Sequence, residues 1–285
     1  MPPLRIVQVS DTHLSQTHAY FQDNWDTFLD CMAEENPDFV FVTGDMCMNG
    51  PKVPGDLKFA RAQMDRLPVP WRAIPGNHDI GDTPPDTRLK GPITRSRRAA
   101  YRKAFGDDFW VQDLGDWRFI GLNAQLMDSG LPGETAQMKM VTDALGSAAT
   151  RQCAVLIHKP LYNKSATERG QSLQALWPKS RKRLLALCEK HKVKLVASGH
   201  RHCYRSLRQG GARLVWAPAT SFIDTRKTNE GLRLTRRVGY VRYTLDGATV
   251  RHELIEPPLF VNSDMRNWMA AHGSTTKLPP RPIKR

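Results

Sequence analysis

The chain has 285 residues, of which 40% are hydrophobic, 25% charged and 8% aromatic. This composition is ordinary for a soluble protein with its own core, so disordered and fibrous classes are excluded for the bulk of the chain, and no run of about 18 uncharged apolar residues predicts a membrane span. The formal net charge of +14 is divided unevenly, with −7 on residues 1–87 and +21 on residues 88–285. This asymmetry is explained equally well by an anionic partner and by a basic surface that keeps the protein soluble.

Short apolar runs of strand length alternate with amphipathic helical patterns in the first two thirds of the chain. Strands are expected at residues 4–9, 39–42, 70–74, 119–122, 154–157 and 194–197. Apolar residues at helical spacing lie between them, at residues 21–32, 57–67 and 184–188. This alternation predicts an α/β fold with a sheet core.

From residue 212 the pattern changes to short strands and turns. Strands are expected at 212–217, 239–244 and 249–255, as an antiparallel sheet that closes the fold. Residues 80–117 are rich in Gly, Pro and Arg and are expected to form an inserted loop or cap, so residues 1–256 form a single domain. Residues 257–285 end in a basic, Pro-rich stretch and are expected to be a flexible tail.

Several of the predicted strands end directly before residue types that bind metals. In α/β sheets, ligands gather outside the carboxyl ends of strands, because the loops there converge on one crevice. Carboxylate or amide oxygens combined with several imidazoles suit Mn, Fe or Zn. The set is larger than one ion can use, so two ions that share a bridging carboxylate are predicted. Its members are Asp11, His13, Asp45, Asn77, His78, His158, His200 and His202.

Each of these motifs has a structural explanation when it stands alone. Asp11-Thr-His13 after a strand is commonly a helix N-cap turn, and Gly44-Asp45 is commonly a simple turn. A lone His158 is more often a hydrogen-bonded core residue. The metal interpretation is favoured because every member of the ordered set lies at a predicted strand end.

The ordered set resembles the signature of calcineurin-like metallophosphoesterases over residues 4–202. The matching blocks are Asp11-x-His13, Gly44-Asp45, Gly76-Asn77-His78-Asp79, His158 and Gly199-His200-x-His202. The resemblance implies a sandwich of two mixed β-sheets flanked by helices, with a dinuclear metal centre. It assigns Asp11, His13 and His202 to the first metal, Asn77, His158 and His200 to the second, and Asp45 to both. Manganese and iron are the expected metals, with zinc as an alternative.

Within the family, the chain is most similar to class III cyclic nucleotide phosphodiesterases. It departs from many relatives at His158-Lys159-Pro160, where they carry a second histidine before the proline, and in the arginine content of residues 80–117. The expected reaction is hydrolysis of a small phosphodiester, with cyclic nucleotides among the candidates, by attack of a metal-bridging hydroxide. His78 would protonate the leaving group, and Asp79 would orient His78 or cap the turn.

Three further polar residues are weaker candidates for the site. Arg201 is expected to be a solvated charge, Asn123 a turn residue, and Lys159 either structural or near the substrate. A small phosphate ester is the expected partner, and the late strands and the tail leave a homodimer open. Five scattered cysteines without a CxxC pair predict neither disulfides nor a cysteine zinc site, and the N-terminal sequence leaves no room for a signal peptide, so a cytoplasmic location is expected.

Other activities remain open beside the phosphodiesterase. A phosphomonoesterase would use the same centre, and so would a nuclease, for which Arg95–Arg98 and Tyr101–Lys103 could form a phosphate-binding patch. A solvated helix face explains that patch better, so nucleic acid is not favoured. A phospholipid substrate would draw on Trp110 and the basic face. A non-catalytic scaffold is disfavoured, because every ligand position is filled.

Overall fold

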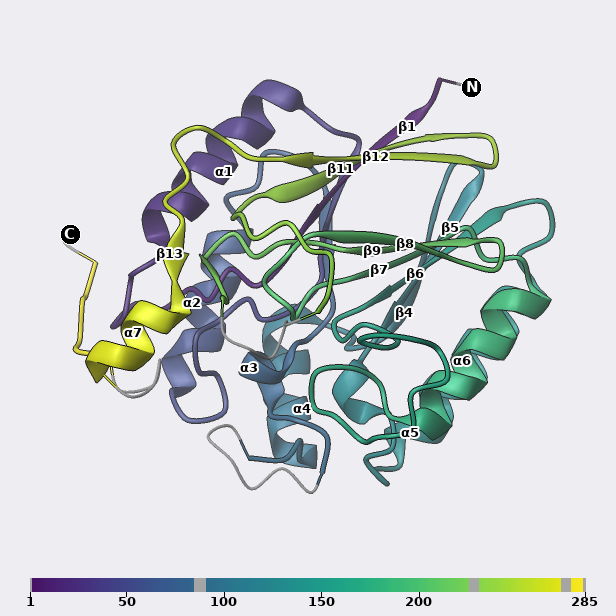
Figure 1. The fold of residues 1–285 in the computed structure, drawn as a ribbon, viewed down its shortest axis with the longest axis horizontal. Helices are drawn as coiled ribbons and strands as arrows, with labels where there is room; N and C mark the ends of the chain where they lie inside the picture. The colour runs from purple at the N-terminus through teal and green to yellow at the C-terminus, as the bar shows by residue number, and fades with distance from the viewer. Residues whose placement is uncertain (1, 85–90, 226–230, 273–277, 284–285) are drawn as a thin grey trace.

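The structure is a computed structural model that describes residues 2–84, 91–225, 231–272 and 278–283. Its centre consists of two β-sheets (Figure 1). The five-stranded sheet has the order β12-β11-β1-β2-β3. These strands are β1 (Leu4–Val9), β2 (Phe39–Val42), β3 (Trp71–Ala73), β11 (Tyr240–Asp246) and β12 (Thr249–Ile255).

The second sheet has six strands in the order β4-β5-β6-β7-β9-β8. They are β4 (Trp110–Leu114), β5 (Trp117–Leu122), β6 (Gln152–Ile157), β7 (Leu195–Ser198), β8 (Arg205–Gln209) and β9 (Ala212–Trp216). A short parallel pair, β10 (Phe222–Ile223) and β13 (Ser263–Asp264), lies outside both sheets.

Both large sheets are mixed. In the first, β1, β2 and β3 are parallel, β11 is antiparallel to β1, and β12 is antiparallel to β11. In the second, β5, β6, β7 and β9 are parallel, with antiparallel β4 and β8 at the two edges. The parallel strands of each sheet therefore deliver their carboxyl ends, and the loops that follow, to one edge.

Apolar side chains fill the space between the sheets and beneath the helices. Between the sheets lie Ile6, Phe41 and Tyr243 from the first sheet and Phe119, Leu156 and Val215 from the second. The outer face of the first sheet is covered by α1 (Gln22–Glu35), α2 (Pro54–Met64) and α4 (Arg95–Phe105), and that of the second by α5 (Gly133–Gly146) and α6 (Pro178–Lys190). The fold is thus the expected sandwich of two mixed sheets flanked by helices.

The late strands form the predicted antiparallel sheet only in part, because β11 and β12 pair antiparallel whereas β9 lies in the other sheet. β9 joins the second sheet, parallel to β7 and antiparallel to β8, whereas β11 and β12 join the first. The placement of all three strands in one sheet was wrong because strand pairing depends on packing across the whole chain. Val215 and Tyr243 each complete the layer between the sheets, although they come from different sheets.

Residues 80–117, where we expected an inserted loop or cap, contain regular structure in their described part. α4 packs against the first sheet through Tyr101, which is fully buried, and β4 forms an edge of the second sheet. Residues 85–90 of this segment lie outside the described residues. The extent of the domain, residues 1–256, stays a prediction.

The expectation of a flexible C-terminal tail is wrong for the described part of residues 257–285. β13 pairs with β10, and α7 (Met265–His272) follows it and buries Met265. Further along, Arg281 exchanges backbone hydrogen bonds with Thr17 and Ala19. The basic, Pro-rich composition conceals this order because backbone pairing with a distant segment leaves no compositional signal. Among the described helices, none combines the length and apolarity that crossing a membrane requires.

Candidate metal centre

The predicted ligands come from loops at the carboxyl ends of five parallel strands. Asp11 and His13 follow β1, Asp45 follows β2, and Asn77 follows β3 at the start of α3 (Asn77–Ile80). From the second sheet, His158 follows β6, while His200 and His202 follow β7. All are buried except His200, which is half-buried. Segments distant in sequence therefore converge on one buried polar cluster.

The backbone at this cluster is held in a conformation that L-residues rarely adopt. Positive φ angles between 47° and 68° occur at Asp11, His13, Asp45, His200 and His202. Non-glycine residues pay a conformational energy for this region, and such residues concentrate at functional sites. Gly44, with a φ of 93°, lies so close to the His158 ring that a Cβ there would be 2.5 Å from Nδ1. The loops are therefore shaped around the side chains of the cluster.

In the carboxylates of Asp11 and Asp45, one oxygen accepts a hydrogen bond from a backbone amide and the other faces histidines. Asp11 Oδ2 accepts hydrogen bonds from Ser10 Oγ at 2.6 Å and from the His200 amide at 2.9 Å. Its Oδ1 is buried, accepts no hydrogen bond from the described residues, and lies 3.3 Å from His202 Nε2. Asp45 Oδ1 accepts from the His78 amide at 2.7 Å, and Oδ2 lies 3.3 Å from His158 Nε2 and 3.9 Å from His13 Nε2.

Backbone carbonyls fix the ring nitrogens of His158 and His200. His158 Nδ1 lies 2.7 Å from the Thr43 carbonyl, and His200 Nε2 lies 2.9 Å from the Leu173 carbonyl, so each nitrogen must donate. The remaining nitrogens, His158 Nε2 and His200 Nδ1, face each other at 3.1 Å. In neutral rings both carry lone pairs, which repel unless a cation lies between them.

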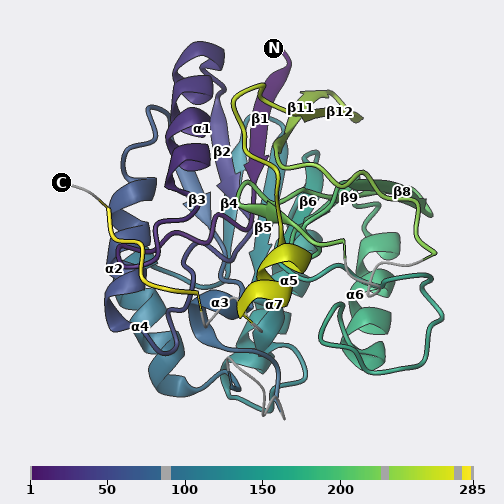
Figure 2. The ribbon, with the colours of Figure 1, turned by 60° about the vertical axis from the view of Figure 1, so that its left-hand side comes forward.

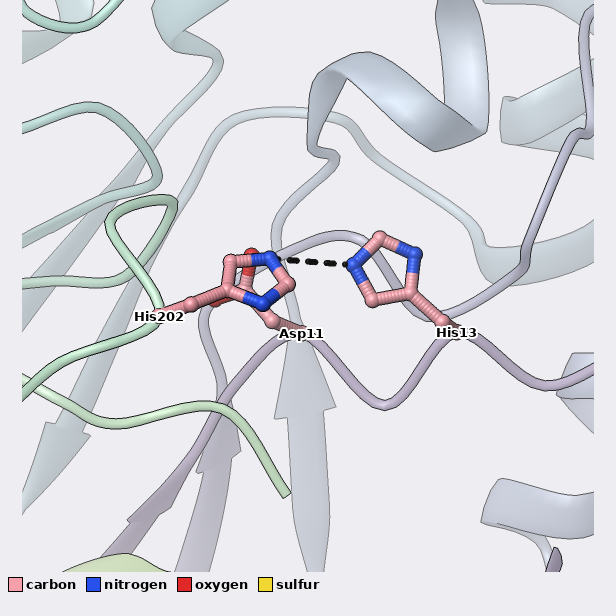
Figure 3. Close-up of side chains that lie close together, drawn as sticks. All are labelled: Asp11, His13 and His202. Carbon is pink, nitrogen blue, oxygen red and sulfur yellow. Dashed lines mark hydrogen bonds and ion pairs between the residues drawn. The ribbon is translucent and has the colours of Figure 1, made fainter. Parts of the chain in front are cut away.

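His202 and His13 also bring two ring nitrogens together (Figure 3). His202 Nδ1 donates to the Phe222 carbonyl at 2.9 Å, which leaves its Nε2 as an acceptor 3.2 Å from His13 Nε2. Asp11 lies beside this pair, and donor atoms of the three residues lie within 4.8 Å of one another. Asp45, His158 and His200 form a corresponding group.

The donor set therefore fits metal ions. Asp11 Oδ1 is a buried acceptor with no donor among the described residues, and His158, His200 and His202 are oriented by carbonyls on their far nitrogens, as metal-ligating histidines usually are. Asn77 Oδ1 adds an oxygen 3.3 Å from His158 Nε2. The structure brings all seven predicted ligands together and places Asp45 between the two histidine groups.

The electrostatics of the cluster favour positive charge. Burial alone would raise the pKa of Asp45, but His158, His78 and His13 lower it well below its ordinary value. Burial would lower the pKa of His158, yet Asp45 raises it to about 9. Burial and the neighbouring charges of His158 and Lys159 hold the pKa of His200 well below its usual range. Without a metal, the cluster thus attracts a proton onto His158.

His78 lies beside the cluster and is more exposed than most of the ligands. Its Nδ1 donates to the Met48 carbonyl at 2.6 Å, and its ring packs edge-on against the ring of His13 with centroids 4.3 Å apart. A donor atom of His78 also lies within 4.8 Å of donors from Asp45 and His13. His78 therefore lies at the edge of the cluster, with its Nδ1 held by a backbone carbonyl.

The Asp79 carboxylate is held by two backbone amides and by the Cys47 thiol, which donates to Oδ1 at 3.2 Å. Its carboxylate accepts from the Gly76 amide at 2.8 Å and from the Cys47 amide at 3.0 Å. Burial, followed by repulsion from Asp45, raises its pKa to about 6. These contacts favour turn capping over direct orientation of the His78 ring.

The three weaker candidates are all buried. Arg201 is 3% exposed and donates to Gln174 Oε1 at 2.5 Å, so the expected solvated charge is wrong. Lys159 forms an ion pair with Asp82. Asn123 caps the short 3-10 helix η1 (Ala124–Leu126) by accepting from the Leu126 amide, in agreement with its interpretation as a turn residue.

The residues that sequence reasoning missed act through their backbone or as hydrogen-bond donors. The carbonyls of Thr43, Met48, Leu173 and Phe222 each accept from a histidine of the site. Ser10 donates to Asp11. A carbonyl contribution carries no residue-type signal, whereas Ser10 could have been noticed because it directly precedes Asp11 at the end of β1.

Comparison with known proteins is consistent with this geometry. The family model for calcineurin-like phosphoesterases matches residues 4–204. The chain is similar to the serine/threonine-protein phosphatase CPPED1 of Homo sapiens, with 30% identity over 178 residues, which cover 58% of this chain and 54% of that protein. The chain thus spans about half the length of that relative. A protein of Xenorhabdus bovienii named as a probable cyclic nucleotide phosphodiesterase is 21% identical over 253 residues, which cover 83% of this chain and 94% of that one.

Solved structures share the fold. A purple acid phosphatase from yellow lupin seeds superposes with a TM-score of 0.67 and 18% identity, covering 99% of this chain and 57% of that one. A dimetal phosphatase from Danio rerio gives a TM-score of 0.59 and 12% identity, covering 90% of this chain and 99% of that one.

Proposed function

The chain belongs to the calcineurin-like phosphoesterase family, and from this premise we propose that it is a dinuclear-metal phosphodiesterase acting on a small phosphate ester. The observation that carries the proposal is the position of Asp45. A single oxygen of this carboxylate faces His13 of one histidine group and His158 of the other. A carboxylate in that position suits a bridge between two ions.

The ligand set divides into two groups around Asp45. Asp11, His13 and His202 would hold one ion, and Asn77, His158 and His200 the other. Nitrogen and oxygen donors without thiolates suit manganese or iron, with zinc as an alternative. Bound divalent ions would supply acidification of water and neutralisation of phosphate charge.

His78 would supply the proton that the leaving group needs. Its Nδ1–H is held by the Met48 carbonyl, so a transferable proton resides on Nε2 of the protonated ring. That proton passes to the departing ester oxygen as its bond to phosphorus breaks, and His78 is left neutral with Nδ1 still protonated. Asp79 would fix the loop that carries His78 by holding the Gly76 and Cys47 amides.

Turnover of matched chromogenic esters tests this proposal. The protein is stripped with a chelator, reloaded with Mn²⁺, and assayed on bis(p-nitrophenyl) phosphate and on the p-nitrophenyl monoester. We expect metal-dependent turnover with a clear preference for the diester, followed by activity on a cyclic nucleotide in a substrate panel. A preference for the monoester would replace the phosphodiesterase with a phosphomonoesterase, and metal-independent turnover would contradict the dinuclear mechanism.

The phosphomonoesterase is the second candidate. It is supported by the likeness to a protein named as a serine/threonine-protein phosphatase, although the aligned region covers only 54% of that protein. The same metal ligands and the same proton donor would serve both reactions. The two reactions would differ only in the residues that surround the ester group of the substrate.

The nuclease alternative receives less support from the basic segment of α4. Tyr101, the aromatic residue in that segment, is fully buried, and Arg98 is bound to the buried Asp108. Neither is available for stacking or for free phosphate contact. Trp110, considered for a phospholipid substrate, is also buried. A small substrate thus remains the better proposal.

We also propose that the protein functions in a reducing compartment such as the cytoplasm. All five cysteines are free thiols, and four of them are buried. Oxidising compartments favour disulfides in secreted domains. A homodimer stays a prediction.

A further inference from the structure

The C-terminal segment carries a group of aromatic and methionine side chains next to the metal cluster. Phe21, Met48, Phe222 and Met265 form its buried part, and Tyr20, Trp268 and Met269 pack against them. Trp268 and Met269 belong to α7, beyond the residues that the family model matches. Figures 1 and 2 show α7 in yellow. We call this group the aromatic wall.

Two members of the aromatic wall also belong to the metal cluster's surroundings. The Phe222 carbonyl accepts from His202, and the Phe222 ring lies with its centroid 4.2 Å from that of His202 and 5.1 Å from that of His13. The Met48 carbonyl accepts from His78. The wall therefore begins in direct contact with a predicted metal ligand and with the predicted proton donor.

Trp268 forms the outer layer of the wall. Its ring centroid lies 5.3 Å from Phe222, 5.1 Å from Phe21 and 6.2 Å from Tyr20. A single ring, Phe222, thus separates Trp268 from the ring of His202. Trp268 and Tyr20 are half-buried, whereas Phe21 and Phe222 beneath them are buried.

The position of α7 is fixed by several contacts. β13 pairs with β10, the strand that contains Phe222, and Thr225 Oγ1 donates to Asp264 Oδ2 at 2.6 Å. Tyr20 is held from the other side, because its hydroxyl donates to the Pro279 carbonyl at 2.7 Å and Arg281 lies over its ring. The wall is therefore a built surface, with its aromatic side chains already oriented.

We infer that Trp268 forms a stacking surface for a planar ring in the ester group of the substrate, so that phosphate esters carrying an aromatic ring, nucleotides included, are preferred over aliphatic ones. The inference rests on the proposed function, since a phosphate held at the metal cluster would direct its ester group toward a neighbouring surface. The face of a tryptophan side chain binds flat aromatic rings well, whatever the identity of the base.

Two ligands that differ only in the base test this inference. Adenosine 5′-monophosphate and ribose 5-phosphate carry the same phosphate and sugar, and their affinities for the Mn²⁺-loaded full-length protein are measured by isothermal titration calorimetry. We expect the nucleotide to bind about ten-fold more tightly, the size typical of one stacked base. Trp268→Leu, which keeps an apolar side chain against Phe21 and Phe222, should remove most of this ratio and leave the ribose 5-phosphate affinity unchanged. Trp268→Phe should retain most of it.

Trp71→Ala is the matched control, because Trp71 is a half-buried tryptophan on β3 outside the wall, and it should keep the wild-type ratio. Equal affinity of the wild type for both ligands, or equal weakening of both by Trp268→Leu, would overturn the inference. If the wild type hydrolyses phosphodiesters yet shows no preference for the nucleotide, the inference fails and the proposed function stands. If it neither hydrolyses phosphate esters nor binds either ligand, both fail.

Discussion

At the scale of single residues, the carboxylates and several histidines of the site each make one contact with the backbone and direct a second polar atom toward the cluster. Asp11 and Asp45 each use one oxygen to hold a backbone amide and turn the other toward histidines. His158 and His202 each give one nitrogen to a carbonyl and present the other to the cluster. The side chains are therefore preorganised, so ions would bind without first having to order them.

Which residues gather could be predicted from sequence, but their orientation could not. Asp11, Asp45 and His158 each lie shortly after the end of a strand, and parallel strands bring such positions to one edge. The carbonyls of Leu173 and Phe222, in contrast, come from irregular segments whose backbone path no residue pattern specifies. Burial of Arg201 was missed because its neighbour Gln174 lies in another loop.

Replacement of the proposed proton donor should separate chemistry from metal binding. His78→Ala is expected to keep the wild-type metal content, since the seven ligands remain. Its turnover of esters with poor leaving groups should fall by about 10²–10⁴-fold, with a much smaller loss on activated aryl esters that need no proton. Steady-state kinetics on both substrate types, with His191→Ala at the end of α6 as the control, measure this difference. Equal losses on the two substrates would remove the assignment.

Metal affinity should depend on pH in a defined direction. In the metal-free protein, Asp45 raises the pKa of His158 to about 9. A metal must displace that proton, so affinity for Mn²⁺ should rise as the pH increases toward 9 and fall as the pH decreases. Calorimetric titrations in buffers of different ionisation enthalpy at pH 7 should reveal proton release. Binding without proton release would contradict a metal site at His158.

At the scale of elements, strands with purely apolar runs were predictable, and their partners were not. β2 occurs where expected because its uninterrupted apolar run suits a strand buried on both faces. β9 also occurs where expected, but its parallel pairing with β7 depends on the rest of the second sheet already being in place. The order of the C-terminal segment could not be predicted, because β13 is only two residues long and α7 depends on packing of Trp268 against Phe21 and Phe222.

Packing of α7 should contribute measurably to stability. Met265 is 7% exposed and lies in the aromatic wall. Met265→Ala is therefore expected to lower the free energy of unfolding by about 2–3 kcal/mol, as truncation of a buried methionine usually does. Urea denaturation measures the change. Leu259→Ala, at a position that is 78% exposed, should change it by less than about 0.5 kcal/mol, and equal effects of the two substitutions would indicate that α7 does not dock.

At the scale of the whole molecule, the metal cluster depends on both sheets. The first sheet supplies Asp11, His13, Asp45 and Asn77, and the second supplies His158, His200 and His202. Gln8 of β1 donates to the Ser198 carbonyl of β7 at 3.0 Å and so ties the sheets together just behind the site. Relative movement of the sheets would separate the two halves of the ligand set, so fold integrity and metal binding are coupled.

The formal net charge of +14 overstates the positive charge that is free to attract an anionic partner. Several arginines of the basic portion are engaged in ion pairs, among them Arg98 with Asp108, Arg118 with Asp113 and Arg181 with Glu168. Their charges are partly offset within the fold. The remaining positive field would still attract a small phosphate ester over longer distances.

The number of metal ions per chain tests the central claim most directly. Inductively coupled plasma mass spectrometry of the Mn²⁺-loaded protein, after removal of free metal, should give two ions per chain. Asp45→Asn should give at most one, because it removes the carboxylate that faces both histidine groups, whereas Asp65→Asn, at an exposed ion pair on the end of α2, should retain two. A wild-type value of one or none, or two ions retained in Asp45→Asn at unchanged affinity, would contradict a dinuclear centre bridged by Asp45.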